Sequence, residues 1–268
     1  MIKFFRKIRQ KLLTENKFSK YLIYAIGEII LVVIGILIAL SINNWNENNK
    51  LIKQELTYLQ NLRDDLKAQI DLLDIYIACE DIIITQSSDV VKHYEINDGF
   101  HNMDSIFPKL NDLTIRWTFS NANTTLMEMI NLGQINIIQN KTLKAELVAF
   151  NQNIEIFSKN TQNNNTNLID NLTVPNLIIR NAYATHGYSV RMTDMFKKFY
   201  LFDFVRVKDD ELAKISTKIL NEPKERLELI NKVAFRNTMA SMQKKGNQSL
   251  KNLAEQILLN VNSEIDRK

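Results

Sequence analysis

The chain has 268 residues, enough for one ordinary domain or for one domain with a membrane anchor. Hydrophobic residues make up 45% of it and can fill a core, while six Gly and three Pro are too few for a collagen-like or low-complexity chain. The single cysteine, Cys79, excludes an internal disulfide framework and any metal site built from several thiolates.

The net charge of +4 is concentrated at the N-terminus. Residues 1–20 carry seven Lys or Arg and one Glu, whereas residues 43–268 carry 27 basic and 28 acidic residues. A nucleic-acid partner needs a basic face on the folded part, so we expect none. Apolar residues at helical spacing in residues 1–20 predict an amphipathic cytoplasmic arm on the lipid bilayer.

Residues 21–42 contain a single charge, Glu28. A helix of that length covers ~33 Å, about the thickness of the hydrocarbon core of a bilayer. We therefore predict a transmembrane helix over residues 21–43. A cleaved signal peptide, with Ala39-Leu40-Ser41 as its processing site, is the alternative, but the long basic region and the long apolar stretch favour a retained signal anchor.

The distribution of Lys and Arg predicts how the chain is oriented. Seven basic residues precede the predicted span, and only Lys50 and Lys53 occur in the 20 positions that follow it. The positive-inside rule places the N-terminus in the cytoplasm and residues 44–268 in the periplasm of a Gram-negative cell. We therefore expect a single-pass inner-membrane protein.

Small residues share one face of the predicted span. Gly27, Gly35 and Ala39 follow one another at spacings of eight and four, beside Glu28. Such spacing lets two helix backbones approach closely and indicates contact with a second copy or with another membrane protein. The alternative is that the carboxylate of Glu28 reaches back to the cytoplasmic interface of the membrane and that the glycines occur there by chance.

The N-terminal run MIKFFRKIRQKLLTENKFSKYLIYAIGEIILVVIGILIALSINNWNE resembles an uncharacterised family of single-pass inner-membrane proteins of Gram-negative bacteria, a domain of unknown function. Residues 126–133 and 135–150 are similar to its second recurring stretch. The resemblance implies an inner-membrane protein with a helical extracytoplasmic region, and it implies no activity or site.

Residues 47–95 predict one long helix, because they lack Gly and Pro and repeat apolar residues every three or four positions from Ile52 to Ile77. This helix can be continuous with the span. The apolar seam lasts fewer than four clean heptads, so packing within the chain is favoured over a coiled coil.

The rest of the chain alternates between turn signals and helical patterns. Asn97-Asp98-Gly99 predicts a turn, and residues 113–119 predict a short strand or an extended segment. Further helices are expected at 123–132 with Gly133 after its end, and at 141–160 with Asn140 as cap. The polar stretch 161–167 is either a loop or an exposed continuation of the helix, which Pro175 ends. The last helices are expected at 209–220 and from Pro223 onward, where a polar stretch around Gly246 interrupts a core face of Leu227, Ile230, Ala234, Leu253, Ile257 and Val261. We therefore predict an all-α fold, with one transmembrane helix followed by an extracytoplasmic bundle of about four long helices.

The sequence contains no nucleotide-binding loop, nucleophile elbow or zinc-protease motif, so we expect no catalytic residues, cofactor or metal. His93 and His101 flank Asp98, and a loop metal site there would make the alternative, a membrane-tethered periplasmic hydrolase. His186 lies near Ser189 without a recognisable orienting group. Cys79 lies in an apolar helical stretch, which predicts a buried, inert thiol.

An aromatic patch follows residue 195: Phe196, Phe199, Tyr200, Phe202 and Phe204. It can close one end of the bundle or form a partner surface, because aromatic side chains are enriched at contact surfaces. Together these features predict a non-enzymatic, membrane-anchored scaffold, assembly or sensing protein. Its expected partners are the lipid bilayer and either a second protein or another copy of itself.

Overall fold

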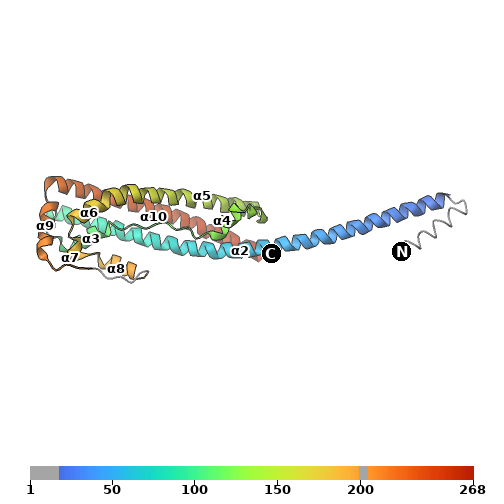
Figure 1. The fold of residues 1–268 in the computed structure, drawn as a ribbon, viewed down its shortest axis with the longest axis horizontal. Helices are drawn as coiled ribbons and strands as arrows, with labels where there is room; N and C mark the ends of the chain where they lie inside the picture. The colour runs from blue at the N-terminus through green and yellow to red at the C-terminus, as the bar shows by residue number, and fades with distance from the viewer. Residues whose placement is uncertain (1–17, 199–204) are drawn as a thin grey trace. The chain divides into compact units, whose positions relative to one another are not determined.

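The computed structural model describes residues 18–198 and 205–268, and these residues form helices without any strand. The all-α prediction is thereby confirmed for this part of the chain, and most of the predicted arm over residues 1–20 lies outside it. The chain divides into two compact units, residues 1–57 and residues 58–268 (Figure 1). Each unit is described by itself below.

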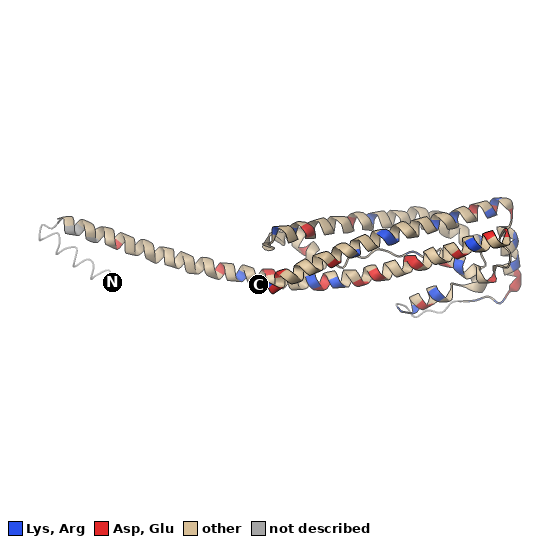
Figure 2. Ribbon diagram, turned by 180° about the vertical axis from the view of Figure 1, so that it is seen from behind, with Lys and Arg blue, Asp and Glu red and all other residues tan. Residues whose placement is uncertain are grey.

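Helix α2 (Phe18–Asn97) has 80 residues and supplies all the described structure of the first unit. The predicted span and the predicted helix over 47–95 are therefore one continuous helix. Between residues 21 and 46 its ribbon carries one charged residue, Glu28, whereas Lys, Arg, Asp and Glu are spread over the helices of the second unit (Figure 2). The unit boundary falls beyond the predicted span, close to Leu59, the first buried apolar side chain of α2.

The second unit is built on three long helices. They are α2, α5 (Lys141–Asn164) and α10 (Pro223–Asp266), and α5 runs on through the π-helix η3 (Asn165–Thr173) into α6 (Val174–Arg180). Short helices connect them: η1 (Met103–Ser105), α3 (Phe107–Asp112), α4 (Thr124–Asn131), η2 (Gln134–Ile137), α7 (Tyr183–His186), α8 (Val190–Lys197) and α9 (Asp210–Leu220). Among the described residues these three helices exceed twenty residues, and the predicted bundle of about four long helices stays a prediction.

The expected helix end at Pro175 is wrong, and the polar stretch 161–167 continues the helix. Pro175 lies in the first turn of α6, directly after the π-helix. A proline is tolerated in a first turn, where its missing N–H would have no partner in an α-helix. The change of helix type thus lets the chain run past the proline.

Local capping signals are mostly confirmed. Asn140 accepts hydrogen bonds from Thr142 N and Leu143 N, both at 3.1 Å, and Asp209 caps α9 through Glu211 N at 2.9 Å. The side chain of Asn123 does not cap α4. The carboxylate of Asp65, on α2, instead accepts from Thr125 N at 2.7 Å. A residue sixty positions away therefore provides the cap.

Two clusters of buried apolar side chains fill the second unit. The first cluster joins α2, α4, α5 and the C-terminal half of α10. The second cluster joins α2 and the N-terminal half of α10 to the short helices α3, α6, α8 and α9. Buried polar side chains lie where the clusters meet, and we call them the polar layer: Glu80, Thr161, Arg236, Gln243 and Asn247. The core is thus interrupted by a set of groups that require hydrogen-bond partners.

Residues 113–123, which we call the strap, run between these helices, and from Ile115 onward the strap is extended but not a strand. Its backbone groups therefore need partners other than a sheet. Side chains of the helices supply them: Gln69, Tyr76, Asn165 and Arg236. Arg236 donates to the carbonyls of Leu113 at 3.3 Å and Ile115 at 2.9 Å.

Gly246 lies in the middle of α10, in the polar stretch that interrupts the apolar face of this helix. A Cβ at this position would lie 2.1 Å from Cε2 of Phe157, whose ring packs edge-on against Phe119. The absence of a side chain at Gly246 therefore leaves room for the ring of Phe157 on α5, and α10 continues through this position without a break.

We expect Gly246→Ala to destabilise the protein by about 1–2 kcal/mol, because overpacking outweighs the gain of ~1 kcal/mol in helix propensity. In a Phe157→Ala background the same substitution should be stabilising, since the clash is gone. Urea denaturation of the four proteins in this cycle measures both signs. Stabilisation by Gly246→Ala alone would contradict the account.

Candidate functional site

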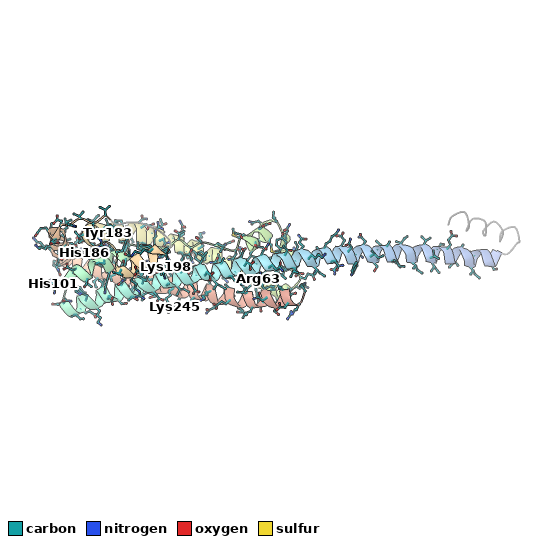
Figure 3. All side chains as sticks on the ribbon, turned by 90° about the horizontal axis from the view of Figure 1, so that it is seen from below. Arg63, His101, Tyr183, His186, Lys198 and Lys245 are labelled. Atoms are coloured by element: carbon teal, nitrogen blue, oxygen red, sulfur yellow. The ribbon has the colours of Figure 1, made fainter. Side chains whose placement is uncertain are left out.

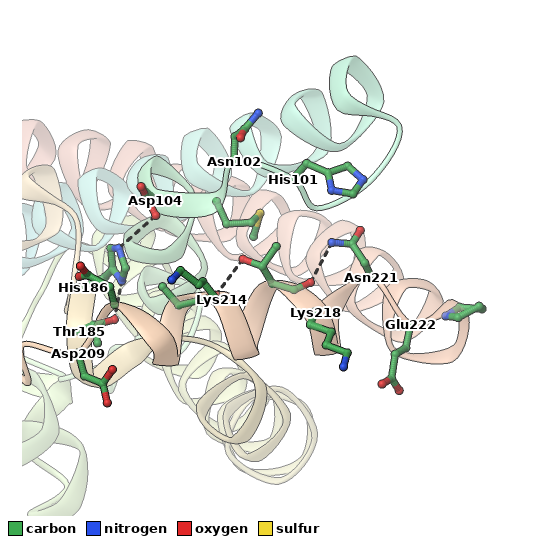
Figure 4. A pocket seen from close by; sticks show the side chains of 15 residues that line it. His101, Asn102, Asp104, Thr185, His186, Asp209, Lys214, Lys218, Asn221 and Glu222 are labelled. Atoms are coloured by element: carbon green, nitrogen blue, oxygen red, sulfur yellow. Dashed lines mark hydrogen bonds and ion pairs between the residues drawn. The ribbon is translucent and has the colours of Figure 1, made fainter.

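A groove of about 1000 Å³ lies at one end of the second unit (Figure 4). The turn after α2, η1, α7, α9 and the start of α10 line it, and the side chains of His101 and His186 lie at this end (Figure 3). Both acidic and basic side chains surround it: Asp104, Asp209, Asp210, Glu222, Lys214 and Lys218.

Two side chains hold the turn over residues 98–101 in place. Asn221 accepts from Phe100 N at 2.9 Å and donates to Phe100 O at 2.6 Å. His93 contacts the backbone carbonyl of His101 through Nε2 at 2.6 Å. One wall of the groove is therefore fixed by hydrogen bonds from α2 and from the residue that follows α9.

His186 is oriented by its neighbours in the groove. Its Nδ1 lies 2.7 Å from Oγ1 of Thr185, which itself lies 3.0 Å from the carbonyl of Ala182. Because a hydroxyl has one proton and Thr185 gives it to Ala182, Nδ1 of His186 is the donor. Nε2 lies 3.9 Å from Asp104, beyond hydrogen-bond length. This geometry positions the imidazole but does not activate Thr185 as a nucleophile.

Ser189 is separate from His186. Its Oγ accepts from Met192 N at 3.2 Å and from Nε2 of Gln86 at 2.9 Å, so the hydroxyl caps α8. In chemical terms the groove offers hydrogen bonds and charges of both signs, which suit binding of a polar ligand.

The structure does not bring His93, His101 and Asp98 together as metal ligands. Nε2 of His93 faces a backbone carbonyl, and its Nδ1 lies 3.4 Å from the amide of Asn97. The described residues contain no group of three or more His, Cys, Asp or Glu side chains placed to hold one metal ion.

Asp112, at the end of α3, is fully buried and accepts from Ser189 N at 3.0 Å through Oδ1. Burial raises the pKa of its carboxyl to about 6, against the opposing effects of hydrogen bonds from Ser189 and Gln86 and of the positive charge of Lys109. Sequence reasoning missed this residue, because its burial depends on segments far apart in the chain.

Cys79 is fully buried, as expected. Burial raises the pKa of its thiol to about 12, and the neighbouring Glu80 acts in the same direction. Such a thiol stays protonated and inert at neutral pH.

Of the aromatic patch, only Phe196 lies within the described residues. Its ring centroid is 5.8 Å from that of Trp117 and 5.7 Å from that of Tyr188. Phe196 therefore belongs to the edge of the core, while Phe199, Tyr200, Phe202 and Phe204 lie outside the described residues.

Gly27, Glu28, Gly35 and Ala39 lie on the part of α2 in the first unit. A Cβ added at Gly27 or Gly35 would meet nothing within 4 Å, and Ala39 is exposed. The side chains around them project outward, and none of the most apolar 18-residue window is buried (Figure 3). The face predicted to pack against another helix is accessible on α2. Contact of this face with a second copy or with another membrane protein stays a prediction.

Arg236 and Glu80 form a buried ion pair that sequence reasoning missed. Nη1 of Arg236 lies 3.6 Å from Oε2 of Glu80, and the two residues are 1% and 5% exposed. Burial raises the pKa of Glu80 and lowers that of Arg236, while each charge opposes the shift of the other. The only signal in the sequence was the polar interruption of the apolar repeat on α10.

These features define a helical protein with one described helix long and apolar enough to cross a membrane by length and composition. Residues 28–172 match the Family of unknown function (DUF6090), and the chain belongs to this family. No curated protein matches the chain, and no solved structure does. This match agrees with the prediction that the chain contains a domain of an uncharacterised family. Location in the inner membrane and origin from a Gram-negative bacterium stay predictions.

Proposed function

We propose that this chain is a non-enzymatic, membrane-anchored helical protein that acts in assembly or sensing through protein contacts. One observation carries the anchor: large apolar side chains from Leu22 to Ile42 are exposed, and none of the apolar window is buried. Continuous apolar surface of this kind is rare on soluble proteins and marks contact with lipid or protein. Transfer of each such side chain out of water is favourable by about 1.5–3 kcal/mol.

The orientation proposed is a single pass with the N-terminus in the cytoplasm. It rests on seven basic residues before the span and two in the 20 positions after it. On this proposal residues 44–268 are periplasmic, the membrane is the inner membrane of a Gram-negative cell, and residues 1–20 contact the anionic leaflet. The groove at the end of the bundle then faces the periplasm, where it can bind a polar ligand or a partner.

Alkaline carbonate extraction of membranes tests the anchor. We expect the full chain to stay in the membrane pellet, and we expect Ile34→Asp combined with Leu37→Asp to release it, because each charge in the span costs about 3 kcal/mol. Asn44→Asp combined with Asn48→Asp is the matched control and should change nothing. Release of the unaltered chain would overturn the proposal.

Lateral contact within the membrane is proposed through Gly27, Gly35 and Ala39, beside Glu28. Gly35→Leu should abolish chemical crosslinking of the full chain to itself or to a co-purified protein in mild detergent, because the added side chain separates the helix backbones. Ile36→Leu, which lies next to it and keeps the span apolar, should leave crosslinking intact. Equal crosslinking in both variants would remove the proposed contact.

The alternative function is a membrane-tethered hydrolase with a metal site at His93, His101 and Asp98. The contact of His93 with a backbone carbonyl, and not with the other imidazole, favours the non-enzymatic proposal. Metal analysis of the purified full chain separates the two. Stoichiometric zinc or manganese that is lost in His93→Ala would favour the hydrolase.

A further inference from the structure

The polar layer of the second unit contains a cavity of about 10 Å³. Glu80 on α2, Thr161 on α5, and Gln243 and Asn247 on α10 contribute polar side chains to its lining. The aromatic residues Tyr76, Trp117, Phe119 and Phe157 complete the walls. Water needs a polar site of about 10–15 Å³, measured by the space open to its centre, so the cavity has room for one such molecule.

Polar atoms of three residues from α2 and α10 at this cavity have no hydrogen-bond partner among the described residues: Oε2 of Glu80, Nε2 of Gln243 and Oδ1 of Asn247. The three residues are only 4–6% exposed, so bulk water does not reach these atoms. Oε2 of Glu80 has an ionic contact with Arg236 at 3.6 Å, which is too long to count as a hydrogen bond. Buried polar atoms of this kind are almost always satisfied, by protein or by ordered water.

The chemistry of the three atoms selects the ligand. Two are acceptors, the carboxylate oxygen of Glu80 and the amide oxygen of Asn247, and one is a donor, the amide nitrogen of Gln243. A water molecule has two protons to give and can accept at least one, and buried waters typically make three hydrogen bonds. A cation is disfavoured, because a donor faces the cavity and the guanidinium of Arg236 already lies beside Glu80.

We propose that this cavity is a specific site for one water molecule, which donates to Glu80 and Asn247 and accepts from Gln243. The site joins α2 to α10 at the point where Glu80 also pairs with Arg236, and Arg236 holds the strap carbonyls. The water is therefore part of the network that fixes the strap against the helices. This inference concerns the second unit and does not depend on the membrane proposal.

Water-selective NMR on the full chain in detergent micelles, with ¹⁵N-labelled glutamine side chains, tests the site. We expect the Gln243 amide to show a cross-peak with water whose sign indicates a residence time longer than nanoseconds. Gln248, exposed on the same helix, is the internal control and should show only rapidly exchanging water. Equal behaviour of the two amides would overturn the proposal.

Asn247→Leu should abolish the Gln243 cross-peak, since leucine keeps the branched shape of asparagine but is larger and has no acceptor, so that it displaces the water. Gln256→Leu, at an exposed position of α10, should leave the cross-peak unchanged. If Asn247→Leu does not fold, high-resolution diffraction from the unaltered full chain decides instead. Density about 2.7–3.2 Å from all three atoms is expected. Featureless density, or an ion bound by oxygens alone at about 2.4 Å, would overturn the proposal.

Discussion

Replacement of Arg236 by alanine is expected to destabilise the second unit by about 3–5 kcal/mol, the cost of removing one partner of a buried ion pair. Glu80 would be left as an uncompensated charge in a site that is 5% exposed. The carbonyls of Leu113 and Ile115 would also lose their donors, so the strap would be held less firmly.

Urea unfolding of the full chain in detergent, followed by circular dichroism, measures this loss. Lys245→Ala, at an exposed position of the same helix, is the control and should change stability by less than about 0.5 kcal/mol. Glu80→Gln combined with Arg236→Met should recover part of the loss, because no buried charge then remains unpaired. A loss below about 1 kcal/mol in Arg236→Ala would contradict the role given to the pair.

The carboxyl of Asp112 should make the protein more stable at pH 5 than at pH 7. Its pKa is about 6 in the folded protein, against about 3.9 in an unfolded chain, so the folded state binds the proton more tightly. The associated stability is fully present below about pH 4 and is lost as the pH rises to about 6. Two pKa units correspond to about 3 kcal/mol at most.

Asp112→Asn should flatten this dependence, since the amide has no charge to bury and keeps an oxygen for Ser189 N. Denaturation at pH 5 and pH 7 measures the difference in both proteins. Asp71→Asn, at an exposed position of α2, is the matched control and should leave the slope unaltered. An unchanged slope in Asp112→Asn would show that this carboxyl does not govern the pH response.

Features of the fold that depend on neighbouring residues were predictable from the sequence. The seam of Leu59, Leu62 and Leu66 repeats at helical spacing, and these residues are buried on α2 as expected. The caps at Asn140 and Asp209 depend on side chains that bond to their own helix, so local sequence is sufficient. The apolar length of residues 21–43 is likewise a local property.

The apolar repeat predicted the buried face of the first half of α10 only in part, since Ile230 packs against the core as expected. Leu227 and Ala234 are exposed, while Leu229 and Val233 are buried. The physical reason is Arg236, a charged residue on the buried face whose partners, Glu80 and the strap, lie more than a hundred positions away. An apolar repeat cannot reveal a buried charge that is satisfied by distant segments.

The groove could not be predicted from the sequence either, because its lining residues come from segments that are far apart in the chain. His101, His186 and Lys214 come from three separated segments, and no spacing in the sequence relates them. The polar layer is similar, because Glu80, Thr161 and Asn247 lie on three different helices. The cap of α4 by Asp65 also depends on tertiary contact alone.

The central proposal is that residues 21–43 span the membrane and place residues 44–268 on its outer side. Paired reporters fused after Lys268 of the full chain test it most directly, one active only in the periplasm and the other fluorescent only in the cytoplasm. We predict activity of the periplasmic reporter and no fluorescence from the cytoplasmic one. A fluorescent cytoplasmic fusion with an inactive periplasmic fusion would contradict the account.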